Sequence, residues 1–172
     1  MIEMIKRLSF NSPFFGLKIR QTRKVTVIDM QVHSPIVNTC EIPETLEFLK
    51  TNYPGVLKTQ CFNDKDLPFS VEVKQTEIGH LFEHILIENL CALKIKGGSK
   101  SAVFNGTTSW NWQKNPYGSF QIWIDIGKKN LPLLIDGLKI TIGLTKQLIK
   151  PSFEALLLDQ TSPTTNNLRA TV

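Results

Sequence analysis

The chain has 172 residues, of which 41% are hydrophobic and 20% are charged, and its formal net charge is +5. These proportions are those of an ordinary globular protein. The basic excess is mild and gathers in small clusters at 18–24 and 94–100, but no RNA- or DNA-binding motif accompanies it. We therefore expect a solvated surface, at most attractive to an anionic substrate, and no nucleic-acid partner.

Cysteine usage and the lengths of apolar runs exclude further classes. Cys40, Cys61 and Cys91 are widely spaced and include no Cys-x-x-Cys pair, so neither a disulfide framework nor a zinc ribbon is predicted. Reduced thiols are the simplest interpretation. The first residues lack the apolar core of a signal peptide, and no apolar run reaches the about 18 residues that span a membrane. We expect a cytoplasmic protein without a membrane partner.

The first third of the chain predicts two strands and a short helix. Residues 24–32 alternate as a strand does, and residues 15–20 are expected to pair with them as an earlier strand. Pro43 suits the first turn of a helix, which continues over 44–52 and stops at a Tyr-Pro-Gly sequence. The polar residues 60–70 predict a loop.

The central part of the chain predicts one long, mostly apolar helix. It covers residues 76–95, with Thr76 as its N-cap and two glycines at 97–98 to end it. Residues 101–104 are a candidate for a short strand. Residues 105–118, rich in Asn, Gly, Thr and Trp, predict a long hairpin connection.

The last third of the chain predicts a strand, a helix and a polar tail. Residues 119–126 alternate between apolar and polar, and residues 131–150 have the periodicity of a second long helix. A short apolar segment at 153–158 precedes a tail, 159–172, that we expect to be disordered. We predict a single domain over 1–158 with an α+β fold: a mainly antiparallel sheet with helices packed on one face, a two-layer sandwich.

The central helix contains the motif His-x-x-Glu-His. Two residues four apart lie one turn apart on the same face of a helix, so His80 and His84 can share one tetrahedral metal ion. Glu83 lies beside them and can take a proton from an attacking water molecule. This is the inverted zincin arrangement, in which the Glu directly precedes the second His.

The surroundings of the motif indicate that its polar side chains need bonding partners. A helix that is apolar nearly all round should be largely buried, and buried polar groups without partners cost several kcal/mol. Metal binding would satisfy the two imidazoles. The structural alternatives are a polar network with neighbouring elements or a histidine stripe that faces solvent.

The chain resembles the N-terminal domain of cyanophycin synthetase. The resemblance is strongest at 79–89, where that family has Gly-His, two apolar residues, Glu-His, three apolar residues and a Glu. It covers roughly residues 5–150 and is elsewhere a similarity of pattern. The other matching features are the segments 12–20 and 24–32, Cys61 near a family cysteine, the turn at 105–108, the sequence Pro-Tyr-Gly at 116–118, and Asp125 at the end of the next strand.

The resemblance implies a domain of a peptide-polymer enzyme that in some members carries its own metal-dependent, peptidase-like site. Over the motif helix alone, the chain is also similar to pitrilysin-type peptidases and to S-ribosylhomocysteine lyase. The ATP-grasp and ligase modules are absent from this sequence, so we do not expect it to make cyanophycin alone. The family's arginines in the Gly/Thr turn are also missing, because Thr107 and Thr108 lead into Ser109 and Trp110. That difference leaves the substrate open.

A catalytic zinc site needs a third protein ligand. Asp125 is our candidate, because it lies at the end of a strand that can approach the motif helix. Glu88 is two turns from the first histidine, about 12 Å along the axis, so we expect it to support the second histidine instead. Cys91 is expected to be a buried thiol. Asp136 and Glu154 remain open.

Three functions are compatible with these residues. The first is a hydrolase of a peptide or amide bond, with zinc or another divalent metal held by His80 and His84 and with Glu83 as the base. The second is a non-catalytic binding or assembly domain. The third is a metal-dependent lyase or isomerase that acts on a small molecule. A homo-oligomer is compatible with each of the three.

The connection after the motif helix is expected to border the substrate. Long loops with exposed aromatic residues are more often functional than structural, although a packed turn is the alternative. The residues expected to contact substrate are Thr107, Thr108, Trp110 and Trp112.

Overall fold

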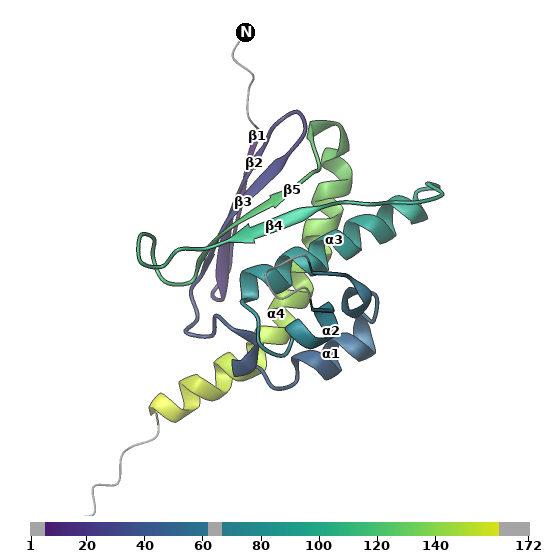
Figure 1. Ribbon diagram of the computed structural model, residues 1–172. Helices are drawn as coiled ribbons and strands as arrows, with labels where there is room; N and C mark the ends of the chain where they lie inside the picture. The colour runs from purple at the N-terminus through teal and green to yellow at the C-terminus, as the bar shows by residue number, and fades with distance from the viewer. Residues whose placement is uncertain (1–5, 62–66, 162–172) are drawn as a thin grey trace, which may run out of the picture.

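A computed structural model describes residues 6–61 and 67–161 of the chain (Figure 1). The strands are β1 (Lys6–Asn11), β2 (Phe15–Gln21), β3 (Thr26–Val32), β4 (Gly106–Ser109) and β5 (Ser119–Ile124). The α-helices are α1 (Thr45–Asn52), α2 (Phe69–Glu72), α3 (Ile78–Lys96) and α4 (Leu131–Thr161). Three short 3-10 helices are η1 (Thr39–Glu41), η2 (Val56–Lys58) and η3 (Lys128–Asn130).

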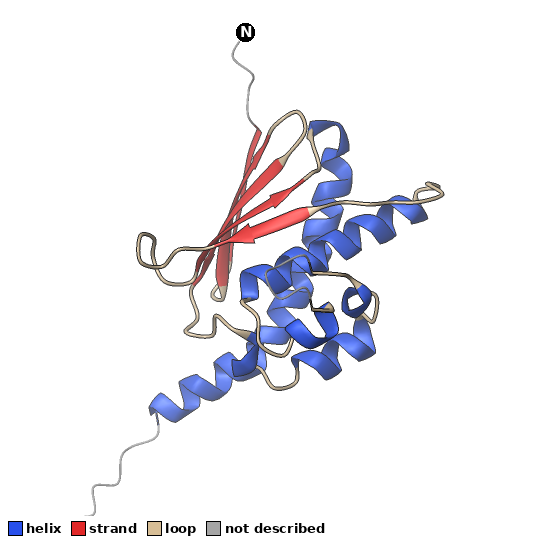
Figure 2. Ribbon diagram, viewed as in Figure 1, coloured by secondary structure: helices blue, strands red, loops and turns tan. Residues whose placement is uncertain are grey.

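The five strands form one open sheet in the order β1-β2-β3-β5-β4, and every neighbouring pair is antiparallel. The helices pack against one face of this sheet, as Figure 2 shows. Alternation sets the faces: Leu17 and Ile122 are buried under the helices, whereas Lys18 is exposed on the opposite face. The predicted α+β sandwich is confirmed.

The two edge strands, β1 and β4, were not predicted, and the predicted strand at 101–104 is absent. Residues 101–104 form no strand, although Phe104 is buried beneath the ammonium group of Lys94. Pairing begins later, at Gly106, which lies opposite Ile124. The sequence of β4, Gly-Thr-Thr-Ser, has no apolar alternation, so its strand conformation depends on the neighbouring strand β5. The hairpin connection is therefore shorter than expected and runs from 110 to 118.

Helix α3 packs close to the sheet and carries the motif. It contacts β4, β5 and α4. Gly79 permits the close approach, because a Cβ atom at this position would overlap the ring of Phe120. The helix ends at Gly97, as predicted, but its N-cap is Glu77 and not Thr76. The hydroxyl of Thr76 is directed to His80 instead.

Helix α4 is longer than predicted. It continues from Leu131 through Pro151 to Thr161, so the apolar segment 153–158 is part of it, as are the first three residues of the expected tail. Its last turns extend beyond the sheet (Figure 1). The rest of that tail, 162–172, lies outside the described residues, as does 62–66 of the predicted loop 60–70. Within the described part of the chain, no helix is both long and apolar enough to cross a membrane.

Candidate metal centre

Three potential metal ligands converge beside the first half of α3. The Nε2 atoms of His80 and His84 are 3.1 Å apart, and the Sγ atom of Cys61 is 3.3 Å from Nε2 of His80. All three ligand atoms lie within 4.8 Å of one another. Two nitrogens that share one tetrahedral zinc ion lie about 3.3–3.4 Å apart, given zinc–nitrogen bonds of about 2.0–2.1 Å. The observed spacing therefore suits a single metal ion.

The outward-facing nitrogens of the two rings are held by threonines. Nδ1 of His84 is 2.8 Å from the hydroxyl of Thr59, and Nδ1 of His80 is 2.7 Å from that of Thr76. Thr59 donates its own proton to the carbonyl of Val56 at 2.6 Å. It must therefore accept a hydrogen bond from His84, which places the ring proton on Nδ1 and leaves the lone pair of Nε2 for a metal.

The ring of Phe69 fixes the two imidazoles from the side. It stacks on His84, with ring centroids 3.8 Å apart and planes inclined by 11°, and it meets His80 edge-on. Phe69 is fully buried at the start of α2, so this contact also excludes water from that side of the two rings. Packed rings with bonded Nδ1 atoms are preorganised for coordination, because little rotamer freedom remains to be lost.

Burial keeps the two imidazoles neutral. It lowers the pKa of His84 to about 3, with the neighbouring His80 lowering it further. Burial also lowers the pKa of His80, although the charge of Glu72 acts in the opposite direction. Neutral imidazole is the form that binds metal. Two imidazoles and a thiolate are ligands that zinc accepts, and three protein ligands are the number found in catalytic sites, which keep a position open.

Glu83 lies on the same helix and reaches a neighbouring strand. Its Oε2 accepts a hydrogen bond from the hydroxyl of Thr108 at 2.5 Å. Gly106 makes room for it, since a Cβ atom there would lie 2.8 Å from Oε1 of Glu83. Burial raises the pKa of the Glu83 carboxyl to about 7, and the Thr108 hydrogen bond opposes this rise. A carboxyl that titrates near neutral pH is suited to general acid–base work.

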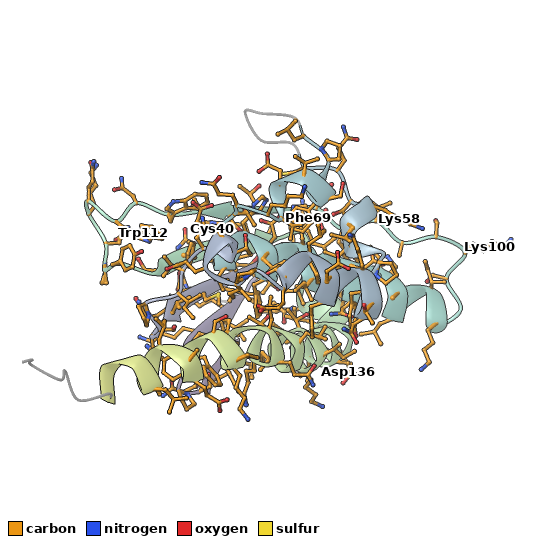
Figure 3. All side chains as sticks on the ribbon, turned by 90° about the horizontal axis from the view of Figure 1, so that it is seen from below. Cys40, Lys58, Phe69, Lys100, Trp112 and Asp136 are labelled. Atoms are coloured by element: carbon orange, nitrogen blue, oxygen red, sulfur yellow. The ribbon has the colours of Figure 1, made fainter. Side chains whose placement is uncertain are left out.

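The three potential ligands and Glu83 line one cavity of about 930 Å³. Thr107, Thr108 and the exposed Trp110 also line it, so β4 and the start of the hairpin form one of its walls. These are three of the four residues that the sequence suggested for substrate contact. The fourth, Trp112, packs against the rings of Phe120 and Tyr117. Figure 3 shows Trp112 well away from Phe69, the ring that stacks on His84.

Several acidic candidates lie elsewhere. Asp125 is exposed, and its two oxygens accept hydrogen bonds from the backbone and side-chain nitrogens of Asn105, so the third group beside the histidines is Cys61 and not Asp125. Glu88 packs against Gly55, and the hydroxyl of Thr59 takes the position beside His84 that was expected for it.

The remaining candidates have local roles. Cys91 is half-buried, and burial raises the pKa of its thiol. Asp136 pairs with Lys139, and Glu154 pairs with Lys150, both on the surface of α4. Figure 3 shows Asp136 on the opposite side of the molecule from Phe69.

Cys61 is the potential ligand that the sequence did not predict. It precedes His80 by 19 residues in a polar segment, so no spacing rule connects it to the motif. The one available signal was its position near a cysteine of the resembled family. Thr59 and Glu72, which also line the cavity, gave no signal at all. Comparison of the chain with models of known protein families and with curated proteins finds no match.

Proposed function

We propose that the protein is a metal-dependent hydrolase of a peptide or amide bond, with Cys61, His80 and His84 as the metal ligands. The observation that carries the proposal is the convergence of the two Nε2 atoms and the Cys61 thiol in a cavity that Glu83 also lines. Zinc is the metal that best suits this ligand set, because thiolate and imidazole together favour it over magnesium or calcium.

The remaining residues divide the chemistry. When bound, the divalent ion would supply a Lewis acid that polarises the scissile carbonyl. Glu83 would accept the proton of the attacking water and return it to the leaving amine. The Thr108 hydroxyl orients the Glu83 carboxyl by its hydrogen bond. The cavity wall formed by β4 and Trp110 would hold the substrate chain.

The resemblance to the N-terminal domain of cyanophycin synthetase supports the same proposal. It favours a peptide or isopeptide substrate over a small molecule. A non-catalytic assembly domain remains the rival, because a buried histidine pair can also serve structure alone.

The test is a screen of peptide and isopeptide libraries with zinc-loaded protein, followed by Glu83→Gln on any substrate found. This change keeps the shape and removes the basicity, so zinc content should be unchanged while turnover falls by about two to four orders of magnitude. Full hydrolysis by Glu83→Gln, or loss of its metal, would instead favour the assembly domain.

A cysteine hydrolase is a second candidate, favoured by one contact. The Sγ atom of Cys61 lies 3.3 Å from Nε2 of His80, and the other ring nitrogen of His80 is held by Thr76. In this arrangement Cys61 resembles a nucleophile, His80 its base and Thr76 the group that orients the base. The two mechanisms respond differently to a chelator. Activity that survives complete removal of metal and is abolished by iodoacetamide would support the cysteine mechanism.

A further inference from the structure

Glu72 is a buried carboxylate that the proposed hydrolysis does not use. It is the last residue of α2 and is 7% exposed, and its Oε1 atom is buried without a hydrogen-bond partner. A buried carboxylate oxygen without a partner costs several kcal/mol, so such an atom in a native protein calls for an explanation. Glu72 also lines the cavity that holds the metal ligands.

Glu72 is not among the potential metal ligands. Within the described residues, that group consists of Cys61, His80 and His84. Glu72 and His80 line the same cavity, and the charge of Glu72 acts on the pKa of His80. A cationic group that enters the cavity beside the metal site would give Oε1 of Glu72 a hydrogen-bond donor.

The lining of the cavity has a charge opposite to that of the whole chain. Its described residues include the carboxylates of Glu72, Glu77 and Glu83 but no lysine or arginine, although the chain has a net charge of +5. Low-dielectric walls of one sign concentrate ligands of the other sign. Trp110, which is 41% exposed, adds an indole that can stack on a cation.

We propose that Glu72 binds a cationic group of the substrate, an ammonium or a guanidinium, beside the bond to be cleaved. The group is either the free amino terminus of a peptide or a basic side chain within it. This specificity rests on the proposed function for its biological meaning. Binding itself can be measured without turnover and without metal.

The test uses four tripeptide amides and calorimetric titration of Glu83→Gln protein, loaded with zinc and also free of it. Acetyl-Ala-Lys-Ala-amide and acetyl-Ala-Arg-Ala-amide carry a basic side chain, and unacetylated Ala-Gln-Ala-amide carries only a free amino terminus. Acetyl-Ala-Gln-Ala-amide is the neutral reference. At least one charged peptide should bind about tenfold to a hundredfold more tightly than the reference, the range of a charge-assisted hydrogen bond.

Variants then assign the preference. Adding Glu72→Gln should reduce it to within about twofold, whereas adding Glu77→Gln, which removes another carboxylate from the same cavity, should leave most of it. A preference that survives Glu72→Gln would overturn the proposal. So would a loss of zinc in Glu72→Gln, which would make this residue a ligand.

If Glu72→Gln does not fold, the Glu83→Gln protein without this second change still tests the cationic subsite. Equal binding of all four peptides to the Glu83→Gln protein, with and without zinc, refutes the subsite. A charge preference in metal-free protein that takes up no zinc would support the subsite while refuting the metal-dependent hydrolase, so the two failures can be told apart.

Discussion

Each histidine of the candidate centre is oriented by a hydroxyl group from outside the motif. Thr59 precedes α3 by a long stretch of chain, and its hydroxyl both donates to Val56 and accepts from His84. The motif alone supplies two imidazoles on one helical face, but the threonines and Phe69 determine which ring nitrogens point at the common space. The orientation of the ligands is therefore a tertiary property.

Thr59→Val tests this role at the scale of one residue. The change keeps the shape of the side chain but removes the acceptor that fixes the tautomer of His84. We expect the affinity for zinc to fall by about tenfold to a hundredfold, the usual effect of losing a partner of a metal-bound histidine. Competition with a chromogenic chelator measures it.

Thr107→Val is the matched control. Thr107 lines the same cavity, but among the described residues its hydroxyl donates to the neighbouring carbonyl of Gly106 and not to a histidine. Its zinc affinity should stay within about twofold of the parent. Equal affinities for Thr59→Val and the parent would show that Thr59 does not position His84.

Of the three potential metal ligands, two could be predicted from the sequence and one could not. The spacing of His80 and His84 gives a shared face, because helical periodicity is local. The third ligand was expected at Asp125, a strand-end carboxylate, whereas the structure places the thiol of Cys61 beside the histidines. The position of Cys61 depends on how residues 59–61 lie against α3, and no local sequence pattern encodes that contact.

At the scale of elements, the packing of α3 on the sheet sets the depth of the site. Gly79 faces Phe120, and Gly106 of β4 faces Glu83, so a missing side chain on each element allows the close approach. Helix α3 consequently carries its histidines and Glu83 into the space beside β4. Small residues at these two contacts are structural requirements of the site.

Gly79→Ala should separate the helix from the sheet. The added methyl group meets the Phe120 ring, so we expect a loss of about 1–3 kcal/mol in the free energy of unfolding, the range for overpacking a core. Gly143→Ala in α4 is the control, because nothing lies within 4 Å of its added Cβ atom. It should stabilise by about 0.5–1 kcal/mol. Urea unfolding of both variants compares them, and equal stabilities would contradict the packing described.

Elements with a clear hydrophobic period were predictable, and those without one were not. The alternation of β5 and the apolar length of α3 both correspond to observed elements. The polar strand β4 was hidden inside a predicted loop, since its conformation comes from pairing with β5. Helix α4 was expected to stop before Pro151 but passes through it. A proline inside a helix removes one backbone hydrogen bond, and in α4 the continuous helix persists nevertheless.

At the scale of the whole molecule, the metal would join two parts of the chain. Cys61 comes from the segment after η2, and both histidines come from α3, so binding ties that segment to the central helix. An ion that binds only the folded state stabilises it by mass action. Free zinc at one hundred times its dissociation constant would contribute about 2.7 kcal/mol.

Thermal unfolding should report this linkage. For a domain of this size, the expected rise in Tm on adding zinc is about 5–10 °C, and a chelator should reverse it. His80→Ala should show no comparable rise, because two ligands no longer complete the group. An equal rise in the variant would place the stabilising zinc elsewhere on the protein.

X-ray absorption at the zinc edge, together with the zinc content per chain, can decide whether Cys61, His80 and His84 bind one metal ion. We predict one zinc per chain, with one sulfur ligand at about 2.3 Å and nitrogen ligands at about 2.0–2.1 Å. Cys61→Ser should remove the sulfur signal. A protein that retains no zinc after zinc is added, or whose zinc has no sulfur ligand, would show that these three residues do not form a metal site.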